Sequence, residues 1–258
     1  GNIDFSDGQV FFGNILAGGE INLSQDVIDN MHENAQIIEN ALIPINFQQS
    51  YNEAKLFSNA LAELPTNSSH INKNGNIHLT GDCQSAMQTY ALSSEELSAA
   101  QSLSYECLSD NGYIVLNVTG ENIDLSNLNL SQLNPIKQRL IWNFNQANQL
   151  IAHHVDVPGS ILATQAHLDN DIIFQSGLEN NSNNDVYGSF NGHVITHSFN
   201  SKARVNLVPL TCNSEIQLNA KPVSINQQLQ TTQNTAINFS LETIDENPES
   251  LQYQILSP

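Results

Sequence analysis

Short apolar segments, separated by glycine and by small polar residues, recur through most of the chain. The clearest apolar run is Leu140–Phe144 (LIWNF), and Gly159–Ala163 (GSILA) follows it after a polar stretch. The same Gly-x-Ile/Val-Leu/Ile-Ala/Thr pattern occurs at Gly13–Ala17 (GNILA) and at Gly192–Thr196 (GHVIT). Three copies of one short strand unit indicate a repeated architecture. We therefore interpret Trp142 and Phe144 as core residues of a repeating unit.

Aliphatic residues at intervals of two or three, with Asn and Ser between them, follow in Ile123, Leu125, Leu128, Leu130 and Leu133. Inward aliphatic rows of this kind are typical of the walls of a parallel β-solenoid. One long α-helix is predicted over residues 46–64, because Asn46 can cap it and Pro65 ends it. Its apolar stripe consists of Phe47, Tyr51, Ala54, Phe57, Leu61 and Leu64. A helix with a single apolar stripe is expected to pack alongside a larger body.

The pattern changes after Pro209, where strict alternation at Ile237, Phe239 and Leu241 predicts a half-buried strand of a β-sandwich. We therefore expect three parts. A mainly β solenoid domain covers 1–210, a linker covers 211–221, and a partial β-sandwich covers 222–258. The chain opens directly into a strand-like segment, and we interpret it as a fragment of a longer protein.

Charge restricts the partners. The 258 residues carry 7 Lys+Arg against 26 Asp+Glu, a net charge of −19, and only 13% of residues are charged. Nucleic acids and anionic membranes require clustered Lys and Arg, so neither is expected to bind. No run of 18 apolar residues is present, and membrane insertion is not expected. A surface rich in Asn, Gln, Ser and Thr favours an extracellular protein, although an ordinary acidic domain has the same composition.

Three cysteines are too few for a disulfide framework and lack metal-site spacing. In an oxidising compartment, Cys83 and Cys107 are the favoured pair and Cys212 is left over. Three buried free thiols are the equally weighted alternative.

Five of the eight histidines fall between residues 153 and 197. If the Gly159 and Gly192 units stack in register, Ser160 lies beside His193 and Thr164 beside His197. A ligand patch would then include His167, His193 and His197. No His-carboxylate metal motif supports a metal there, and exposed histidines are the favoured interpretation. Catalytic motifs are also lacking, so we expect no enzyme.

The GNILA segment, the helix at 46–64, LIWNF, GSILA and the segment 191–198 (NGHVITHS) together resemble the choice-of-anchor A domain. This family of bacterial cell-surface proteins is described as adhesive or collagen-binding. Thr164 replaces the family's usual Pro, and Thr196-His197 replaces Ala-Lys. The layout is also similar to bacterial ice-binding proteins, which implies a right-handed solenoid beside a helix. It does not imply ice binding, because no Thr-x-Thr ladder is present.

Residues 222–258 resemble the first half of a cadherin-like repeat of large bacterial adhesins. The resemblance places Asp245, Asn247 and Glu249 on the family's acidic positions, where oxygen ligands suit Ca²⁺. Pro248 replaces the usual Gly, and a solvated acidic turn is the alternative.

These resemblances imply a non-catalytic adhesive module of a large adhesin on the bacterial cell surface. Host or surface glycans and collagen-like matrix proteins are the expected partners, with Ca²⁺ as a candidate cofactor and biofilm as a setting. Two alternatives stay open: a passive structural cap or spacer, and an ice-binding or polysaccharide-active solenoid.

Overall fold

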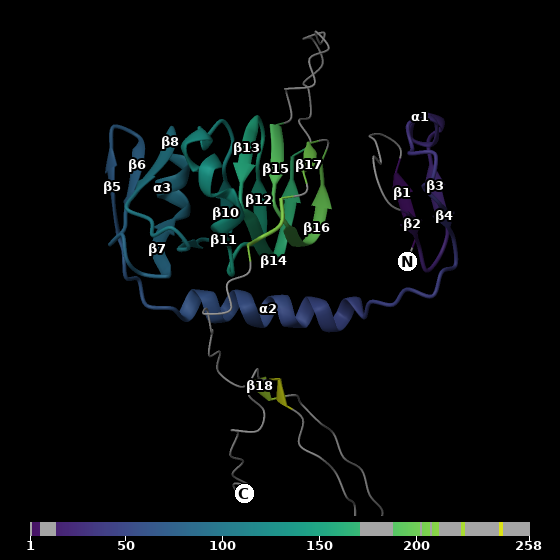
Figure 1. The fold of residues 1–258 in the computed structure, drawn as a ribbon, viewed down its shortest axis with the longest axis horizontal. Coiled ribbons are helices and arrows are strands. Elements are labelled where there is room, and N and C mark those ends of the chain that lie inside the picture. Colours follow the sequence, from purple (N-terminus) through teal and green to yellow (C-terminus); the bar gives the residue numbers. More distant parts are fainter. Residues whose placement is uncertain are drawn as a thin grey trace, which may run out of the picture.

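A computed structural model describes residues 2–5, 14–170, 188–201, 203–206 and 208–211 (Figure 1). It also describes the backbone of 223–224 and 243–244. Outside these ranges lie Gly13, Cys212 and the three residues Asp245, Asn247 and Glu249 that were predicted to bind calcium.

A seven-stranded, all-parallel sheet forms the centre of the fold. Its strand order is β10-β12-β14-β11-β9-β7, and β16 pairs with β14. The bounds are β7 (Met87–Ser93), β9 (Tyr113–Thr119), β10 (Asn122–Asp124), β11 (Leu140–Asn143), β12 (Gln149–Ile151), β14 (Ser160–Asp169) and β16 (Val194–Asn200).

Smaller sheets complete the described strands. One joins β5 (Ser69–Lys73), β6 (Asn76–Thr80) and β8 (Ser102–Glu106), and another joins β13 (Val155–Pro158), β15 (Gly188–Asn191) and β17 (Arg204–Asn206). Two parallel pairs lie near the N-terminus: β1 (Ile3–Phe5) with β3 (Ile21–Leu23), and β2 (Ile15–Leu16) with β4 (Ile37–Ile38). One antiparallel pair joins β18 (Val223–Ser224) and β19 (Thr243–Ile244).

Four helices occur in the described part of the chain: α1 (Gln25–Asp29), α2 (Phe47–Glu63), α3 (Ser94–Ser98) and the 3₁₀ helix η1 (Ser131–Arg139). The predicted cap of α2 is confirmed, since the Asn46 side chain accepts a hydrogen bond from the Gln49 amide at 3.1 Å. The predicted stripe is buried only toward the helix C-terminus. Leu61 is fully buried, whereas Phe47 at the first turn is 68% exposed.

The predicted fold class was wrong. A right-handed parallel β-solenoid with one long helix and a partial sandwich was expected. The described strands instead form a curled parallel sheet shaped like a half-barrel, and the helical residues of the described chain are divided among four short helices. The reason lies in β14, which pairs with β11 near Ser160 and with β12 near His167, so strands expected on separate walls merge into one sheet.

The spacing of paired residues also departs from a regular repeat. Met87 pairs with Tyr113, 26 residues later, whereas Ile141 pairs with Ser160 after only 19 and Ile161 with Val194 after 33. The partial sandwich lies almost wholly outside the described residues, and the boundary at 211–221 stays a prediction.

The concave side of the sheet encloses the main core. Trp142 and Phe144 are fully buried, which confirms their predicted core role, and their rings stack at 6.1 Å. The indole of Trp142 donates a 2.8 Å hydrogen bond to the carbonyl oxygen of Pro158, so its only polar atom is paired. On the other face of the sheet, Leu61 of α2 packs on Val115 and Ile141.

A buried polar network fastens α2 to the sheet. The Asn143 side-chain amide donates to the Ser58 carbonyl oxygen (2.9 Å) and to Asn117 Oδ1 (2.8 Å). Asn143 Oδ1 accepts a 2.6 Å hydrogen bond from Ser58 Oγ, and Asn117 donates to the Leu61 carbonyl oxygen at 2.7 Å. Because Ser58 and Asn143 are fully buried, these bonds fix the helix at one position along the sheet.

Candidate functional site

An exposed polar surface covers the half of the central sheet that α2 does not contact. It is built from β10, β12, the second half of β14 and the second half of β16. Side chains alternate across each strand. The middle residues Ile123, Leu150 and Leu168 point into the core and are almost completely buried. Their neighbours on either side therefore point to solvent.

These outward residues form two rows across four strands, which we call the polar ladder. The first row contains Asn122, Gln149, His167 and Ser198, and the second contains Asp124, Ile151, Asp169 and Asn200. All are exposed except Ile151 and Asp169, which are half-buried. Strand geometry sets about 4.8 Å between neighbours in a row and about 6.7 Å between the rows.

Hydrogen bonds between strands order part of the polar ladder. His167 Nδ1 lies 2.6 Å from Ser198 Oγ, and the Asn200 amide donates to Asp169 Oδ1 at 3.3 Å. Asp124 is held locally instead, since it accepts a 2.8 Å hydrogen bond from the backbone amide of Ser126, two residues further along the chain. The outcome is a broad face with amide, hydroxyl, imidazole and carboxylate groups at fixed spacing. Such a face can hydrogen-bond a flat ligand that carries many hydroxyl groups.

The structure separates the three histidines that were predicted as a patch. His167 belongs to the polar ladder, whereas His193 precedes β16 and borders an apolar depression at the edge of the sheet. His197 turns toward α2, where its ring meets Tyr51 edge-on at 6.5 Å. Among the described residues, no three His, Cys, Asp or Glu side chains gather closely enough to hold a metal ion.

The stacking predicted for the two Gly units is confirmed at its start. Ile161 pairs with Val194, and the His193 amide donates to Ser160 Oγ at 3.4 Å. The register shifts between Ala163 and His167, so Thr164 and His197 are not a registered pair, although Tyr51 contacts both. This irregularity bends β14 and turns the following segment into the polar ladder.

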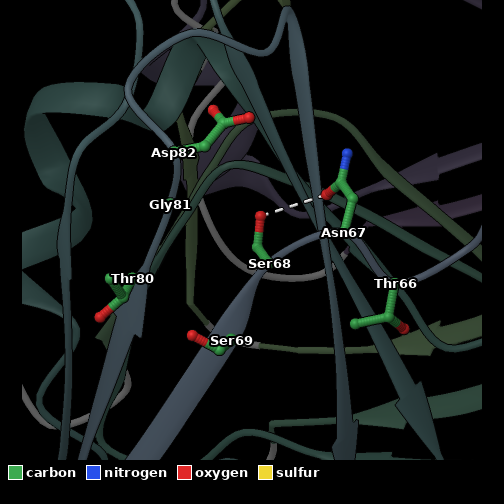
Figure 2. A pocket seen from close by; sticks show the side chains of 7 residues that line it. All are labelled: Thr66, Asn67, Ser68, Ser69, Thr80, Gly81 and Asp82. Carbon is green, nitrogen blue, oxygen red and sulfur yellow. Dashed lines mark hydrogen bonds between the residues drawn. The ribbon is translucent and has the colours of Figure 1, made fainter.

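A small polar depression lies at the other end of the molecule (Figure 2). Its volume is about 310 Å³, and its lining is Thr66, Asn67, Ser68, Ser69, Thr80, Gly81 and Asp82. Asp82 is the only ionised group in this lining, but it is already engaged. Its carboxylate accepts hydrogen bonds from Gln84, Ser85 and Gln88. The Ser85 hydroxyl, followed by the Ser85 and Gln84 amides, lowers the pKa of Asp82 far below its usual value. Asp82 therefore closes a turn and does not offer a free ligand.

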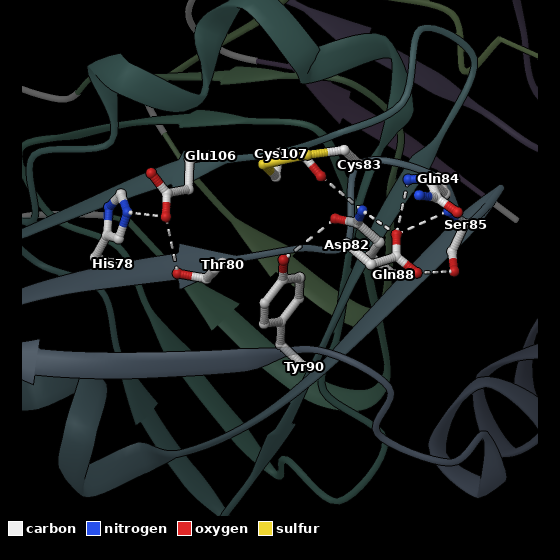
Figure 3. Close-up of a disulfide and its surroundings, with 10 residues drawn as sticks. All are labelled: His78, Thr80, Asp82, Cys83, Gln84, Ser85, Gln88, Tyr90, Glu106 and Cys107. Atoms are coloured by element: carbon white, nitrogen blue, oxygen red, sulfur yellow. Dashed lines mark hydrogen bonds and ion pairs between the residues drawn. A yellow bond between two sulfur atoms is a disulfide. The ribbon is translucent and has the colours of Figure 1, made fainter.

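A disulfide joins Cys83 and Cys107 beside this turn (Figure 3). The Cys83 amide also donates to the Cys107 carbonyl oxygen at 2.9 Å, and Gln88 donates to the same oxygen at 2.8 Å. Tyr90 donates to Gln88 Oε1 beneath them, and burial raises the pKa of its phenol. The disulfide links the loop after β6 to the loop after β8. Cys83 and Cys107 are the cysteine pair that the sequence favoured for an oxidising compartment.

None of the helices in the described part of the chain is long and apolar enough to cross a membrane.

Sequence reasoning missed the polar ladder. Its signal is an apolar residue between two outward residues, repeated in Asn122–Asp124, Gln149–Ile151, 167–169 and 198–200. The intervals between these segments are unequal, so no single period reveals that they lie side by side.

Comparison with known proteins gives a family. Residues 1–207 match the profile of the family described as "Putative Ice-binding-like adhesive domain". A solved ice-binding protein from the Antarctic ascomycete Antarctomyces psychrotrophicus is similar at 12% identity and a TM-score of 0.42. The alignment covers 83% of this chain and 95% of that one. No curated protein matches the chain.

Proposed function

The chain belongs to the family of ice-binding-like adhesive domains, and from this premise we propose that it is a non-catalytic adhesive module that binds polysaccharide through the polar ladder. This family is of a non-enzymatic kind, and its description supports an adhesive role without naming a ligand. The ligand class is our own inference. The observation that carries it is the in-register arrangement of eight outward positions across four parallel strands, six of them exposed and two half-buried.

Hydroxyl-rich chains suit this surface for a chemical reason. Amide, hydroxyl and imidazole groups donate and accept hydrogen bonds, as sugar hydroxyls do. Carboxylates at Asp124 and Asp169 add strong acceptors for hydroxyl donors. A polymer chain that lies across several strands would contact several side chains of a row at once, and these weak contacts would sum to useful avidity.

Ice also presents hydroxyl groups, but the polar ladder suits it poorly. The two carboxylates hold water strongly, and no row of threonines replaces them. We therefore expect immobilised polysaccharide to retain the protein, and we expect the protein to cause no thermal hysteresis in freezing solutions.

The location proposed for this module is the bacterial cell surface, as part of a large adhesin. Support comes from the adhesive family, the amide-rich acidic composition and the disulfide between Cys83 and Cys107. Residues 222–258 are proposed to begin a cadherin-like spacer with a calcium-binding turn at Asp245, Asn247 and Glu249. A calcium titration followed by isothermal calorimetry tests that turn directly.

A binding screen of the full chain tests the function. The probes are immobilised neutral and acidic polysaccharides, fibrillar collagen and growing ice. Binding to at least one polysaccharide, without shaping of ice crystals, is expected. Binding to collagen alone would replace the saccharide proposal with a matrix-protein one. Retention by none of the probes would favour a passive cap or spacer.

A further inference from the structure

The polar ladder is longer across the strands than along them. Its four strands β10, β12, β14 and β16 lie side by side in the sheet (Figure 1). Each row crosses all four strands and offers four side chains, whereas each single strand offers only two. Steps along a row equal the strand spacing of about 4.8 Å, and steps along a strand are about 6.7 Å. A linear polymer therefore meets twice as many side chains when it lies across the strands.

The spacing along a row selects the shape of that polymer. In an extended β-1,4-linked chain, both bridging bonds of each pyranose ring are equatorial, so each sugar unit advances about 5 Å, close to the strand spacing of about 4.8 Å. Over the three spacings of the polar ladder the mismatch accumulates to about 1 Å, which side-chain rotamers can absorb. An α-1,4-linked chain coils instead, and its successive units do not follow a straight row.

The second row of the polar ladder adds a period of two sugar units. Asp124 and Asp169 stand two strands apart, about 9.6 Å, and the half-buried Ile151 lies between them. Successive sugars of a fully extended β-1,4-linked chain face opposite ways, so one edge of the chain presents the same hydroxyl groups at every second unit. Both carboxylates can therefore accept hydrogen bonds from equivalent hydroxyls. The apolar side chain of Ile151 then meets the unit between them.

The charge of the polar ladder restricts the ligand further. Its eight residues include two carboxylates and neither lysine nor arginine. The carboxylate of a uronic acid would find no cation there, and Asp124 and Asp169 would repel it in a chain whose net charge is −19. Neutral sugars meet no such repulsion, because their hydroxyls donate hydrogen bonds to carboxylates. The polar ladder therefore favours a neutral polysaccharide over an acidic one.

We propose that the ligand of the polar ladder is a neutral, extended β-1,4-linked polysaccharide, and that one chain lies across β10, β12, β14 and β16 with one sugar unit on each strand. This inference rests on the proposed function and adds to it the linkage, the charge and the direction of the bound chain. Each sugar unit contacts the first-row and the second-row side chain of its own strand. Four units therefore fill the site, and further units extend beyond it.

NMR titration of the full chain with soluble oligosaccharides tests the proposal. The probes are β-1,4-linked glucose oligomers of two, four and six units. The matched control is the six-unit α-1,4-linked glucose oligomer, which contains the same sugar and differs only in its linkage. A six-unit β-1,4-linked oligomer of mannuronic acid tests the charge. Two variants locate the binding: His167→Ala/Ser198→Ala lies in the polar ladder, and His78→Ala/Ser104→Ala lies outside it.

Affinity for the β-1,4-linked glucose oligomers is expected to rise about tenfold or more from two to four units, because two further strands add hydrogen bonds. From four to six units it should rise by no more than about threefold, the statistical gain from additional binding registers. The α-1,4-linked and mannuronic acid oligomers should bind about tenfold more weakly than the six-unit β-1,4-linked glucose oligomer. The ladder variant should lose affinity for four units, and the other variant should not.

Several outcomes would overturn the inference. An affinity that already levels off at two units would place the polymer along one strand. Tighter binding of the α-1,4-linked or the mannuronic acid oligomer, lost in the ladder variant, would refute the linkage or the charge while the proposed function stands. Binding that the ladder variant leaves unchanged would refute the proposed function as well. If no β-1,4-linked glucose oligomer binds, the inference fails, and the polysaccharide screen decides the proposed function separately.

Discussion

Removal of Asn143 from the buried network between α2 and the sheet should uncouple the helix. In Asn143→Ala, the Ser58 hydroxyl and the Asn117 amide oxygen each lose a hydrogen-bond partner. The Ser58 carbonyl oxygen loses one as well. Each buried polar group left unpaired costs about 1–3 kcal/mol, so a loss of about 3 kcal/mol or more in the free energy of unfolding is expected.

The assay is equilibrium denaturation in urea, followed by the fluorescence of Trp142, which is the single tryptophan and neighbours Asn143. A double-mutant cycle with Ser58→Ala isolates the pair. Ser58→Ala alone should cost about 1 kcal/mol. In the double variant the two effects should not add, because Asn143 and Ser58 share one hydrogen bond. Strict additivity, or a cost below about 0.5 kcal/mol for Asn143→Ala, would refute the view that this network holds α2 in place.

Three further predictions concern stability. Gly159→Ala should cost about 2 kcal/mol or more in urea denaturation, because Gly159 has φ +95° and a Cβ there would lie 2.7 Å from the Leu140 carbonyl oxygen; an unchanged midpoint would contradict this. Cys83→Ala/Cys107→Ala should cost about 3 kcal/mol, since the bond closes a 24-residue separation, and treatment of the wild type with reductant should match it. The hydrogen bond from His70, and then that from the Ser93 amide, lowers the pKa of Glu96. Ionised Glu96 therefore stabilises the fold fully at pH values above its usual pKa of 4.5, and this stabilisation is lost as the pH falls through the lower pKa of the folded state. When the pH is lowered below 4.5, the melting temperature of Glu96→Gln should fall less than that of the wild type. Equal falls in the two proteins would contradict this role of Glu96.

Local features could be predicted from the sequence where neighbouring residues alone decide them. Asn46 and Gln49 begin α2, and an apolar run with a single tryptophan marks a buried strand. The register at Ser160 and His193 followed from a repeated pattern. All three depend on residues close in sequence or on direct similarity between segments.

The curvature of the sheet depends on what the sequence does not display. β14 is long enough to pair with two different strands, and the irregularity after Ala163 lets it turn between them. The residue types of Thr164, Gln165 and Ala166 do not predict that bend. The polar ladder is a consequence of the bend, so it could not be found before the strand order was known. For the same reason His167, His193 and His197 looked like one patch but face three surroundings.

The most direct test of the central claim compares two His–Ser pairs on polysaccharide. His167→Ala/Ser198→Ala removes a pair from the polar ladder. His78→Ala/Ser104→Ala removes a similar pair, with 2.9 Å between Nδ1 and Oγ, from the sheet of β6 and β8. Two lost hydrogen bonds at about 0.5–1.5 kcal/mol each predict roughly tenfold weaker binding of the retained polysaccharide by the ladder variant. The His78/Ser104 variant should bind like the wild type. Equal affinity of the ladder variant and the wild type would contradict the assignment of adhesion to this surface.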